Sequence, residues 1–375
     1  MTGVVVTGLG VVSPGGGDPA ALAARLDAGT PVFAADAAGR PAGRVDADAL
    51  PLDRYLPRKQ RKLVSRVATF GIVAAGRAIE TAGLRAAGLA PRDVGIFGAA
   101  GIRPGSDRLV ARLRRAARVA ADGPTAGRAW DVYTAVVDPM DLLVSMASSP
   151  ADHTAVTNAL RGATCTYIGR GSAALVALRE AARRIARGEQ RAMVVLASDS
   201  LLDAWWRRLA GATDGGLADA GRAGCVPAEG AAAVVLEAEP AARARGAAIH
   251  ARLAGGATRL APDGDVAEAL GRAMRAARGA AAGAPLVLGC SNGAPARDRA
   301  ERRAVDALFG AGTPIHATRR VVGELGAAGA LLDVAVGAAA LGAGRWPGGA
   351  SLARGVLVNA LGDEGFAAAV RLEAA

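Results

Sequence analysis

A strand–turn–helix pattern at Cys165–Gly188 has the shape of an element that carries a catalytic nucleophile. Its sequence is CTYIGRGSAALVALREAARRIARG: a short β-branched and aromatic run, a turn with two glycines, and apolar residues at helical spacing beyond it. Such a turn holds a side chain at the N-terminus of a helix, where backbone N–H groups and the helix dipole stabilise negative charge. The apex here is glycine, Gly171. The element therefore has the geometry of nucleophilic catalysis and lacks the reactive atom.

Other candidate nucleophiles lack supporting groups. Ser172 follows the apex, but a serine nucleophile needs a base, and no histidine has a sequence context that places it at the turn. We therefore expect Ser172 to cap the helix. Cys165 lies inside the predicted strand and is expected to be a small buried side chain. The three cysteines and three histidines are irregularly spaced, so we expect no disulfide framework, no metal site and no cofactor.

Strand-like runs alternate with helix-like runs along the whole chain, which predicts an α/β fold with covered sheets. The strands form two sets of five, so we expect two duplicated halves, residues 1–240 and 241–375, that share one core. The apolar run 326–344 could span a bilayer by length, but Asp333 lies near its middle, which favours a buried helix. Strands are expected at 4–7, 94–97, 165–168, 193–197, 232–237, 249–253, 286–288, 315–317, 355–359 and 367–372, and helices at 66–82, 106–121, 172–187, 265–278 and 324–341.

The net charge of +11 comes almost entirely from arginine, because Lys59 and Lys62 are the only lysines. Aromatic residues make up 3% of the chain and are not interleaved with arginine blocks, so the stacking pattern of a nucleic-acid-binding protein is missing. The charge favours an acidic protein partner instead. The cysteine usage and the Gly-rich, uncharged start of the sequence predict a cytoplasmic protein.

Several segments in order resemble the ketosynthases of fatty-acid and polyketide synthesis. VVVTGLGVVSPGG at 4–16 is similar to their first strand and turn, and the segment from Leu160 to Ser200 is similar to their nucleophile strand, turn and next strand. CVPAEGAAAVVLE at 225–237 and NALGDEGFAAAV at 359–370 resemble a later loop and strand and the closing loop. The resemblance implies a thiolase-like fold with two duplicated βα halves in a layered αβαβα arrangement.

The same resemblance implies that every catalytic position has changed. The family's nucleophilic cysteine falls at Gly171, its first histidine at Cys290, its lysine at Arg319 and its second histidine at Glu324. The aromatic residue of the closing loop is replaced within residues 362–365, which read GDEG. A glycine cannot form a thioester, and a carboxylate cannot replace a neutral histidine as a hydrogen-bond donor to an enolate.

Such a chain resembles the chain-length factors, the inactive second subunits of type II polyketide ketosynthases. Those subunits often carry glutamine at the apex, where this chain has Gly171. We therefore expect no catalytic residues and no activity by the chain itself. The expected role is to pair with an active ketosynthase as part of a beta-ketoacyl synthase complex and to shape the acyl tunnel for a polyketide or polyene chain.

Two surfaces follow from this resemblance. The first is a cluster of basic residues: Arg58, Lys59, Arg61, Lys62 and Arg66. It is expected to dock an acidic acyl carrier protein, with a merely solvated basic face as the alternative. The segment Met140-Asp141-Leu142 stands where the family crosses its dimer interface into the partner's tunnel, with ordinary interface packing as the alternative. A carboxylate beside an acyl chain must be paired, so we expect Asp141 to meet an arginine or a backbone donor.

The sequence is also compatible with other functions. Cys290 or Ser172 could support altered chemistry, either acyl transfer or malonyl decarboxylation, and the chain could be a homodimeric acyl-binding scaffold. Arg319 is expected to form a structural ion pair with Glu324 or with Asp363. The strand at Ala163–Ile168 is expected to pair across a two-fold axis.

Overall fold

The computed structural model is built around a ten-stranded mixed sheet. It describes residues 3–36, 38–101, 109, 111–115, 131, 138–203, 206, 217–218, 224–281, 283–362 and 365–375. All ten predicted strands are present in it. In sheet order they are β5 (Thr164–Ile168), β4 (Val94–Ala100), β6 (Ala192–Ser200), β7 (Glu229–Ala238), β1 (Val4–Val12), β8 (Ala251–Leu260), β12 (Phe366–Glu373), β11 (Val356–Leu361), β9 (Leu286–Leu288) and β10 (Ile315–His316).

The two halves of this sheet have the same topology. In the first half β4 is parallel to β5 and β6, and β7 is antiparallel to β6 and β1. In the second half β9 is parallel to β10 and β11, and β12 is antiparallel to β11 and β8. A short antiparallel pairing joins the halves, with Val5 opposite Arg252 and Val6 opposite Ala251. This repeat is the duplicated α/β architecture expected from the sequence, while the boundary at residue 240 remains a prediction.

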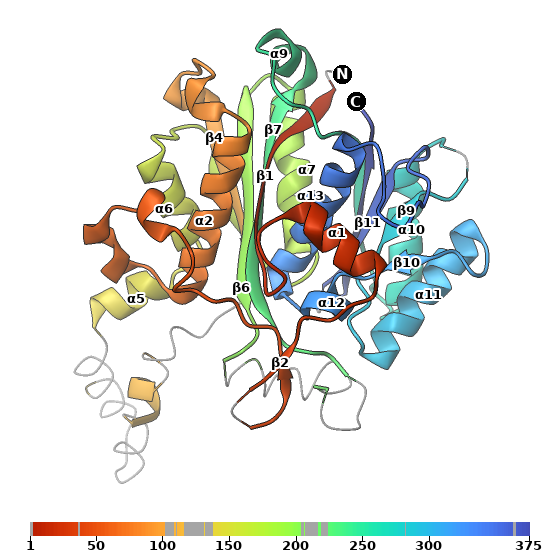
Figure 1. The fold of residues 1–375 in the computed structure, drawn as a ribbon, viewed down its shortest axis with the longest axis horizontal. Coiled ribbons are helices and arrows are strands. Elements are labelled where there is room, and N and C mark those ends of the chain that lie inside the picture. Colours follow the sequence, from red (N-terminus) through yellow and green to blue (C-terminus); the bar gives the residue numbers. More distant parts are fainter. Residues whose placement is uncertain are drawn as a thin grey trace.

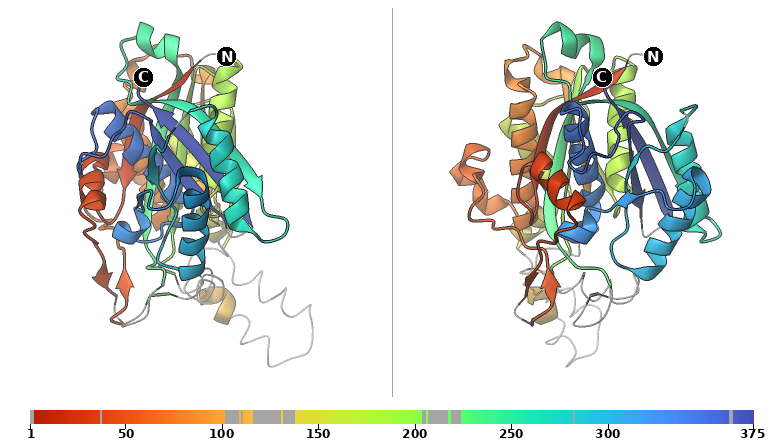
Figure 2. Two further views of the ribbon diagram at one scale, coloured as in Figure 1. Left: turned by 90° about the vertical axis from the view of Figure 1, so that its right-hand side faces the viewer. Right: turned by 45° about the vertical axis from the view of Figure 1, so that its right-hand side comes forward.

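Helices cover both halves and fill the space between them (Figures 1 and 2). α2 (Arg66–Thr81) packs on β1, β7 and β6 at one outer face, and α10 (Val266–Arg278) packs on β8, β12 and β11 at the other. α7 (Ala173–Ala186) and α13 (Gly329–Gly342) lie between the two halves, where their buried residues belong to one large apolar cluster. The resulting layers alternate helix and sheet.

The other elements connect or flank these layers. Helices expected at 66–82, 172–187 and 265–278 are confirmed within two residues, whereas the helix expected from Glu324 begins at Gly329. Gly323 and Gly326 have positive φ values of 91° and 56°, which delay the helix. The remaining elements are α1 (Pro19–Asp27), β2 (Ala34–Ala35), β3 (Pro41–Ala42), η1 (Leu52–Arg54), η2 (Arg58–Leu63), η3 (Leu84–Ala86), η4 (Pro91–Asp93), α5 (Pro139–Ser145), α6 (Ser149–Thr157), α9 (Glu239–Ala244), α11 (Pro295–Phe309), α12 (Arg319–Val322) and η5 (Gly326–Ala328).

The helix expected at 106–121 lies largely outside the described residues. Residues 111–115 within it are helical. The apolar run 326–344 forms η5 and α13, which are buried as expected. Among the described residues, no helix has the length and apolar character needed to cross a membrane.

Candidate functional site at the turn after β5

The turn between β5 and α7 has no room for a nucleophile. A Cβ atom at Gly171 would lie 2.3 Å from the backbone oxygen of Leu361 and 3.3 Å from Nη2 of Arg297. A real Cβ needs more than about 3 Å, and a backbone oxygen in β11 cannot move aside as a flexible side chain can. Glycine is therefore required here by the close approach of β11.

Arg297 fills the space beside this turn. It comes from the first turn of α11, and its Nη2 donates to the oxygen of Leu361 at 2.8 Å while its Nε donates to the oxygen of Cys290 at 3.1 Å. The guanidinium thus ties β11 to the end of β9 next to Gly171. Arg297 was not predicted from the sequence, because no local pattern marks an arginine that reaches across two strands.

Ser172 does not act as a side-chain cap. It occupies the N-cap position of α7 and is buried, but its side chain makes no capping hydrogen bond. Its backbone oxygen accepts from the N–H groups of Leu175 and Val176 instead. The expectation of side-chain capping was wrong, because Ser172 already has helical backbone angles (φ −81°, ψ −24°), whereas capping serines adopt extended ones.

Cys290 is a fully buried thiol at the end of β9. Burial, together with the nearby carboxylate of Glu301, raises the pKa of Cys290 well above its ordinary value. Glu301 is itself buried and accepts from the N–H of Cys290 at 2.8 Å and from the N–H of Ser291 at 2.7 Å. The thiol therefore stays protonated at neutral pH, the state in which cysteine is a weak nucleophile.

Arg319 is the centre of a buried ion-pair network. Its Nη1 donates to Asp333 Oδ2 at 2.7 Å and to the oxygen of Gly289 at 2.9 Å, and its Nε lies 3.6 Å from Glu324 Oε2. The expected pairing of Arg319 with Glu324 is confirmed, whereas Asp363 lies outside the described residues. Asp333 was missed as the nearest partner, although a single carboxylate in an apolar helix already required a cation.

The two carboxylates of this network differ in their pKa shifts. Burial raises the pKa of Asp333 to about 6, even though Arg319 and Thr318 oppose the shift. Burial also acts to raise the pKa of Glu324, but Arg319, Arg297 and a hydrogen bond from Asn292 outweigh it and hold that pKa below its ordinary value. Asn292 Nδ2 donates to Glu324 Oε2 at 3.0 Å. Glu324 is therefore an anion that accepts hydrogen bonds and cannot donate one.

The positions implied by the family resemblance do come together in space. Arg297 lies beside Gly171 and donates to the backbone oxygens of Cys290 and Leu361. Arg319 donates to the backbone oxygen of Gly289 and pairs with Glu324. In the described part of the chain this cluster presents a protonated thiol and paired charges. No group of at least three histidine, cysteine or acidic side chains among these residues is placed to hold a metal ion.

The segment expected to reach a partner is exposed on α5. Met140 and Leu142 are 41% and 46% exposed, whereas Asp141 is buried. The carboxylate of Asp141 accepts from Nη1 of Arg112 at 2.5 Å, which confirms the expected arginine partner. α5 is thus fixed through Asp141 while the apolar side chains on either side of it remain accessible.

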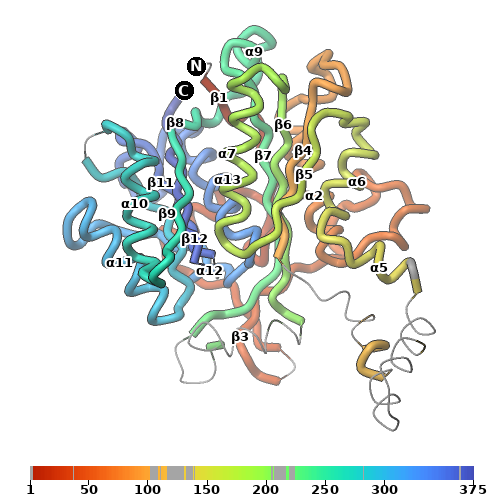
Figure 3. The backbone as a smooth tube through the Cα atoms, turned by 180° about the vertical axis from the view of Figure 1, so that it is seen from behind, coloured from red at the N-terminus to blue at the C-terminus, as the bar shows by residue number. Residues whose placement is uncertain are grey.

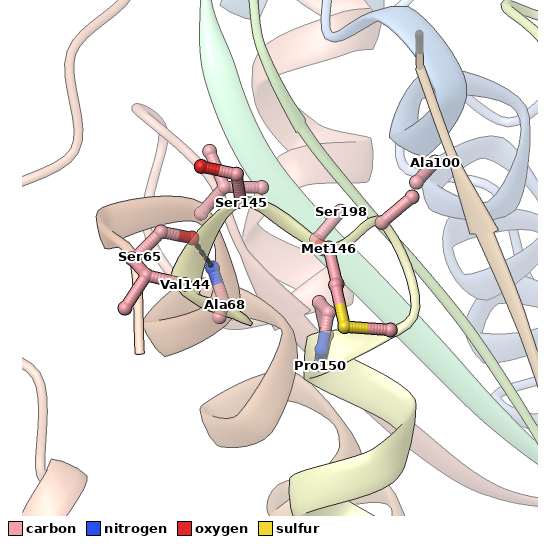
Figure 4. Close-up of a pocket in the computed structure, with 10 residues that line it drawn as sticks. Ser65, Ala68, Ala100, Val144, Ser145, Met146, Pro150 and Ser198 are labelled. Carbon is pink, nitrogen blue, oxygen red and sulfur yellow. Dashed lines mark hydrogen bonds between the residues drawn. The ribbon is translucent and has the colours of Figure 1, made fainter. Parts of the chain in front are cut away.

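A small pocket lies behind the end of α5 (Figure 4). Its volume is about 30 Å³. Its lining includes Ser65, the N-cap residue of α2, together with Ala68, Met146, Pro150 and Ser198. A space of this size holds about one or two water molecules and no acyl chain. As lined by the described residues, this pocket beside α5 is therefore too small to serve as an acyl channel.

The strand β5 lies at the edge of the sheet and is largely exposed. Within the described residues it pairs only with β4, and Ile168 is 60% exposed. Cys165 is exposed too, so the expectation of a buried side chain was wrong for the single chain. The apolar strand sequence was read correctly, but it does not reveal that the strand borders solvent on one side.

The basic cluster lies on a short 3₁₀ segment, η2, ahead of α2. Arg58, Lys59 and Lys62 are exposed, and Arg61 pairs with Asp53. Arg66 does not belong to this surface, because its guanidinium turns to Glu229, with Nη2 2.6 Å from Oε1.

Comparisons with known proteins agree with this architecture. The family model described as beta-ketoacyl synthase, N-terminal domain, matches residues 1–242. The tetracenomycin polyketide synthase ketoacyl synthase beta subunit of Streptomyces glaucescens is 30% identical over 358 residues, which cover 88% of this chain and 84% of that protein. The corresponding alpha subunit is 29% identical over 362 residues, covering 88% and 82%.

A solved structure shows the same fold. The ishigamide ketosynthase/chain length factor superposes with a TM-score of 0.81 at 20% identity, covering 100% of this chain and 99% of the other. The fold is therefore that of the thiolase-like ketosynthases. The chain belongs to the beta-ketoacyl synthase family.

Proposed function

We propose that this chain is a non-catalytic, chain-length-factor type subunit that pairs with an active ketosynthase and shapes the acyl tunnel of a type II polyketide or polyene synthase. The observation that carries the proposal is the closed turn at Gly171. A side chain there would collide with the backbone of β11, so an acyl group has no attachment point at the position where the family forms its thioester.

The surroundings of the turn support the absence of condensation chemistry. Cys290 is buried with a raised pKa, and Glu324 and Arg319 are committed to a buried ion-pair network. Decarboxylation by the family route needs neutral donors that stabilise an enolate. An anionic Glu324 opposes the development of that negative charge.

The exposed apolar side chains support pairing with a second subunit. Six of the eight exposed large apolar side chains among the described residues lie on α5, on α6, on the turn between them or on the edge strand β5, and these elements are drawn close together in Figure 3. The other two, Leu260 and Phe366, lie on β8 and β12. Grouped exposed apolar side chains mark protein interfaces, and an unpaired strand edge can extend its sheet into a partner. The residues concerned are Met140, Leu142, Leu143, Met146, Val156 and Ile168.

The relatives suggest the nature of the partners. A beta and an alpha ketoacyl synthase subunit occur in the tetracenomycin polyketide synthase, and a solved complex of similar fold joins a type II ketosynthase with its acyl carrier protein. We assign the active ketosynthase as the paired subunit. The exposed cations Arg58, Lys59 and Lys62, with Arg61 beside them, are the proposed docking site for an acidic carrier protein.

Met140 and Leu142 are the proposed tunnel residues. Both are exposed on α5 and flank Asp141, whose ion pair with Arg112 holds the helix. In the paired complex their bulk would limit the length of the acyl chain. The three free cysteines agree with work in the cytoplasm, where thiols stay reduced.

Co-expression with a ketosynthase that has an intact Cys/His/His site tests the proposal. We expect an equimolar complex that makes product, and loss of product when the partner's nucleophilic cysteine is replaced by alanine. Alone, the chain should be poorly soluble or form a substitute homodimer. Chain elongation by the isolated protein would favour altered chemistry. A stable homodimer that binds no ketosynthase would favour an acyl-binding scaffold.

A further inference from the structure

A hollow of about 390 Å³ lies between α7 and β8. Its walls are mostly small or apolar, including Val4, Ala182 and Leu253, and two arginines of α7, Arg179 and Arg183, line it. A cationic group at the edge of an apolar hollow is costly to leave without an anion, because part of its hydration is lost.

Arg179 is held in one place by its surroundings. Its side chain crosses β8 at Gly256, where a Cβ atom would lie 2.9 Å from Cδ of the arginine. Beyond this crossing, Nη1 donates to Oγ1 of Thr258 at 2.7 Å. The missing side chain at Gly256 therefore creates the path that positions the guanidinium, and a positioned guanidinium loses little entropy when it binds an anion.

Arg179 forms no ion pair with a carboxylate among the described residues. The carboxylate of Glu180 pairs with its other neighbours instead: Oε2 lies 3.4 Å from Nη1 of Arg183, and Oε1 lies 3.8 Å from Nε of Arg184. Burial lowers the pKa of Arg179, and the charges of Arg183 and Arg259 lower it further. The helix thus presents more positive than negative charge to the hollow.

The place of the hollow indicates which anion it receives. α7 follows β5 directly in the chain, and Figure 3 shows α7, β8 and β5 on the same side of the molecule. This is the side whose open strand edge and apolar residues are proposed to meet the second subunit. Charge complementarity across an interface selects the partner and fixes its register.

We propose that the hollow between α7 and β8 receives an aspartate or glutamate side chain of the ketosynthase partner, with Arg179 as its main contact. This inference rests on the proposed pairing. A carboxylate binds the two parallel N–H groups of a guanidinium, and Arg183 supplies a second cation at the rim. The contact would specify the orientation of the two subunits, which the apolar surface alone leaves less well defined.

The test uses the co-expressed complex with Arg179→Gln and Arg183→Gln introduced together. We expect the dissociation constant of the subunits to rise at least about tenfold, and its dependence on ionic strength to decrease. Arg187→Gln is the matched control, because Arg187 lies at the end of the same helix, outside the hollow, and faces Glu189 at 3.7 Å. It should change the constant less than about twofold.

A second variant tests position separately from charge. Gly256→Ala keeps every arginine but displaces the side chain of Arg179, so it should weaken association. Its thermal unfolding is measured alongside that of wild type, because the new Cβ atom would also lie 3.1 Å from Cγ1 of the buried Val370. Normal affinity and salt dependence in the double arginine variant would overturn the inference and leave the pairing intact. Saturable binding of inorganic phosphate by the isolated chain, lost in that variant while assembly is unaffected, would also overturn it and assign a small-anion site. Failure of the wild-type chains to associate would instead contradict the proposed function.

Discussion

Replacing Arg319 with methionine should greatly lower the free energy of unfolding of the chain. Arg319 is 1% exposed and forms ion pairs with both Asp333 and Glu324, so the Arg319→Met variant removes that ion-pair partner from two buried carboxylates. Removing one member of a buried ion pair costs about 3–5 kcal/mol, and this network places the variant at the upper end of that range. Urea denaturation at one protein concentration measures the free energy of unfolding.

The pH dependence of this loss follows from the pKa values. Burial already raises the pKa of Asp333 to about 6, and without the cation this pKa rises further in the folded state. The pKa of Glu324, which Arg319 helps to hold below its ordinary value, also rises when Arg319 is removed. The folded variant then binds more protons than its unfolded chain, so its free energy of unfolding increases as the pH falls. The difference between wild type and variant should therefore shrink from about pH 7 to about pH 5.

A neighbouring arginine provides the control. The side chain of Arg320 is 60% exposed and pairs with Asp298 at the surface, so Arg320→Met should cost no more than about 1 kcal/mol at any pH in this range. If the Arg319 and Arg320 variants lose equal stability and show the same pH dependence, the buried network has no structural role and the reasoning is refuted.

Three further predictions concern other parts of the chain. Gly171→Cys should lower the stability of the chain and give no condensing activity, as measured by thermal unfolding and a product assay, because the new side chain meets Leu361. In assembled complexes, alanine at Met140 or Leu142 should lengthen the products and tryptophan should shorten them or stop synthesis, since each methylene that gains apolar burial is worth about 0.8 kcal/mol. Glu239→Gln should lower the denaturation midpoint near neutral pH but not near pH 2. Hydrogen bonds from Arg252 and Arg243 lower the pKa of Glu239 from 4.5 to about 2 in the folded chain. The stability that the ionised Glu239 contributes is therefore lost as the pH falls from about 4.5 to about 2.

Each of these three predictions has a control variant or an outcome that would contradict it. Gly271→Ala is the control for the turn, because a Cβ atom at Gly271 in α10 meets no atom within 4 Å. Elongation by the Gly171→Cys chain would show that the site retains its supporting groups. Products of constant length across the Met140 and Leu142 series would assign α5 to interface packing, and a stability difference at Glu239 that persists at low pH would exclude the ion-pair explanation.

The strands could be predicted because each is a short apolar run bounded by turn residues, and this local pattern survives in the folded chain. The edge position of the strand at Ala163–Ile168 was expected only through the family resemblance, because the local pattern carries no information about strand partners far away in sequence. The exposure of Cys165 in the single chain was not predicted for the same reason. The same limit applies to Ser172, whose backbone angles are set by the close packing of β11 on the turn.

The substituted catalytic positions were found through the family resemblance, but their new contacts were not. Arg297 joins two strands that are separated by many residues, and no spacing in the sequence relates it to Leu361. Asp333 could have been assigned a cation in advance, because a carboxylate in a buried apolar helix requires one. That the cation is Arg319 depends on how α12 is placed relative to α13, which the sequence does not show.

The proposed function requires that this chain carries no acyl group. Intact mass spectrometry of both subunits, after the complex is incubated with acyl- and malonyl-carrier protein, tests it most directly. We expect a covalent acyl adduct on the ketosynthase subunit and an unchanged mass for this chain, in the presence and absence of its partner. An acyl adduct on this chain at Cys290 or Ser172, or loss of carbon dioxide from malonyl-carrier protein with this chain alone, would contradict it.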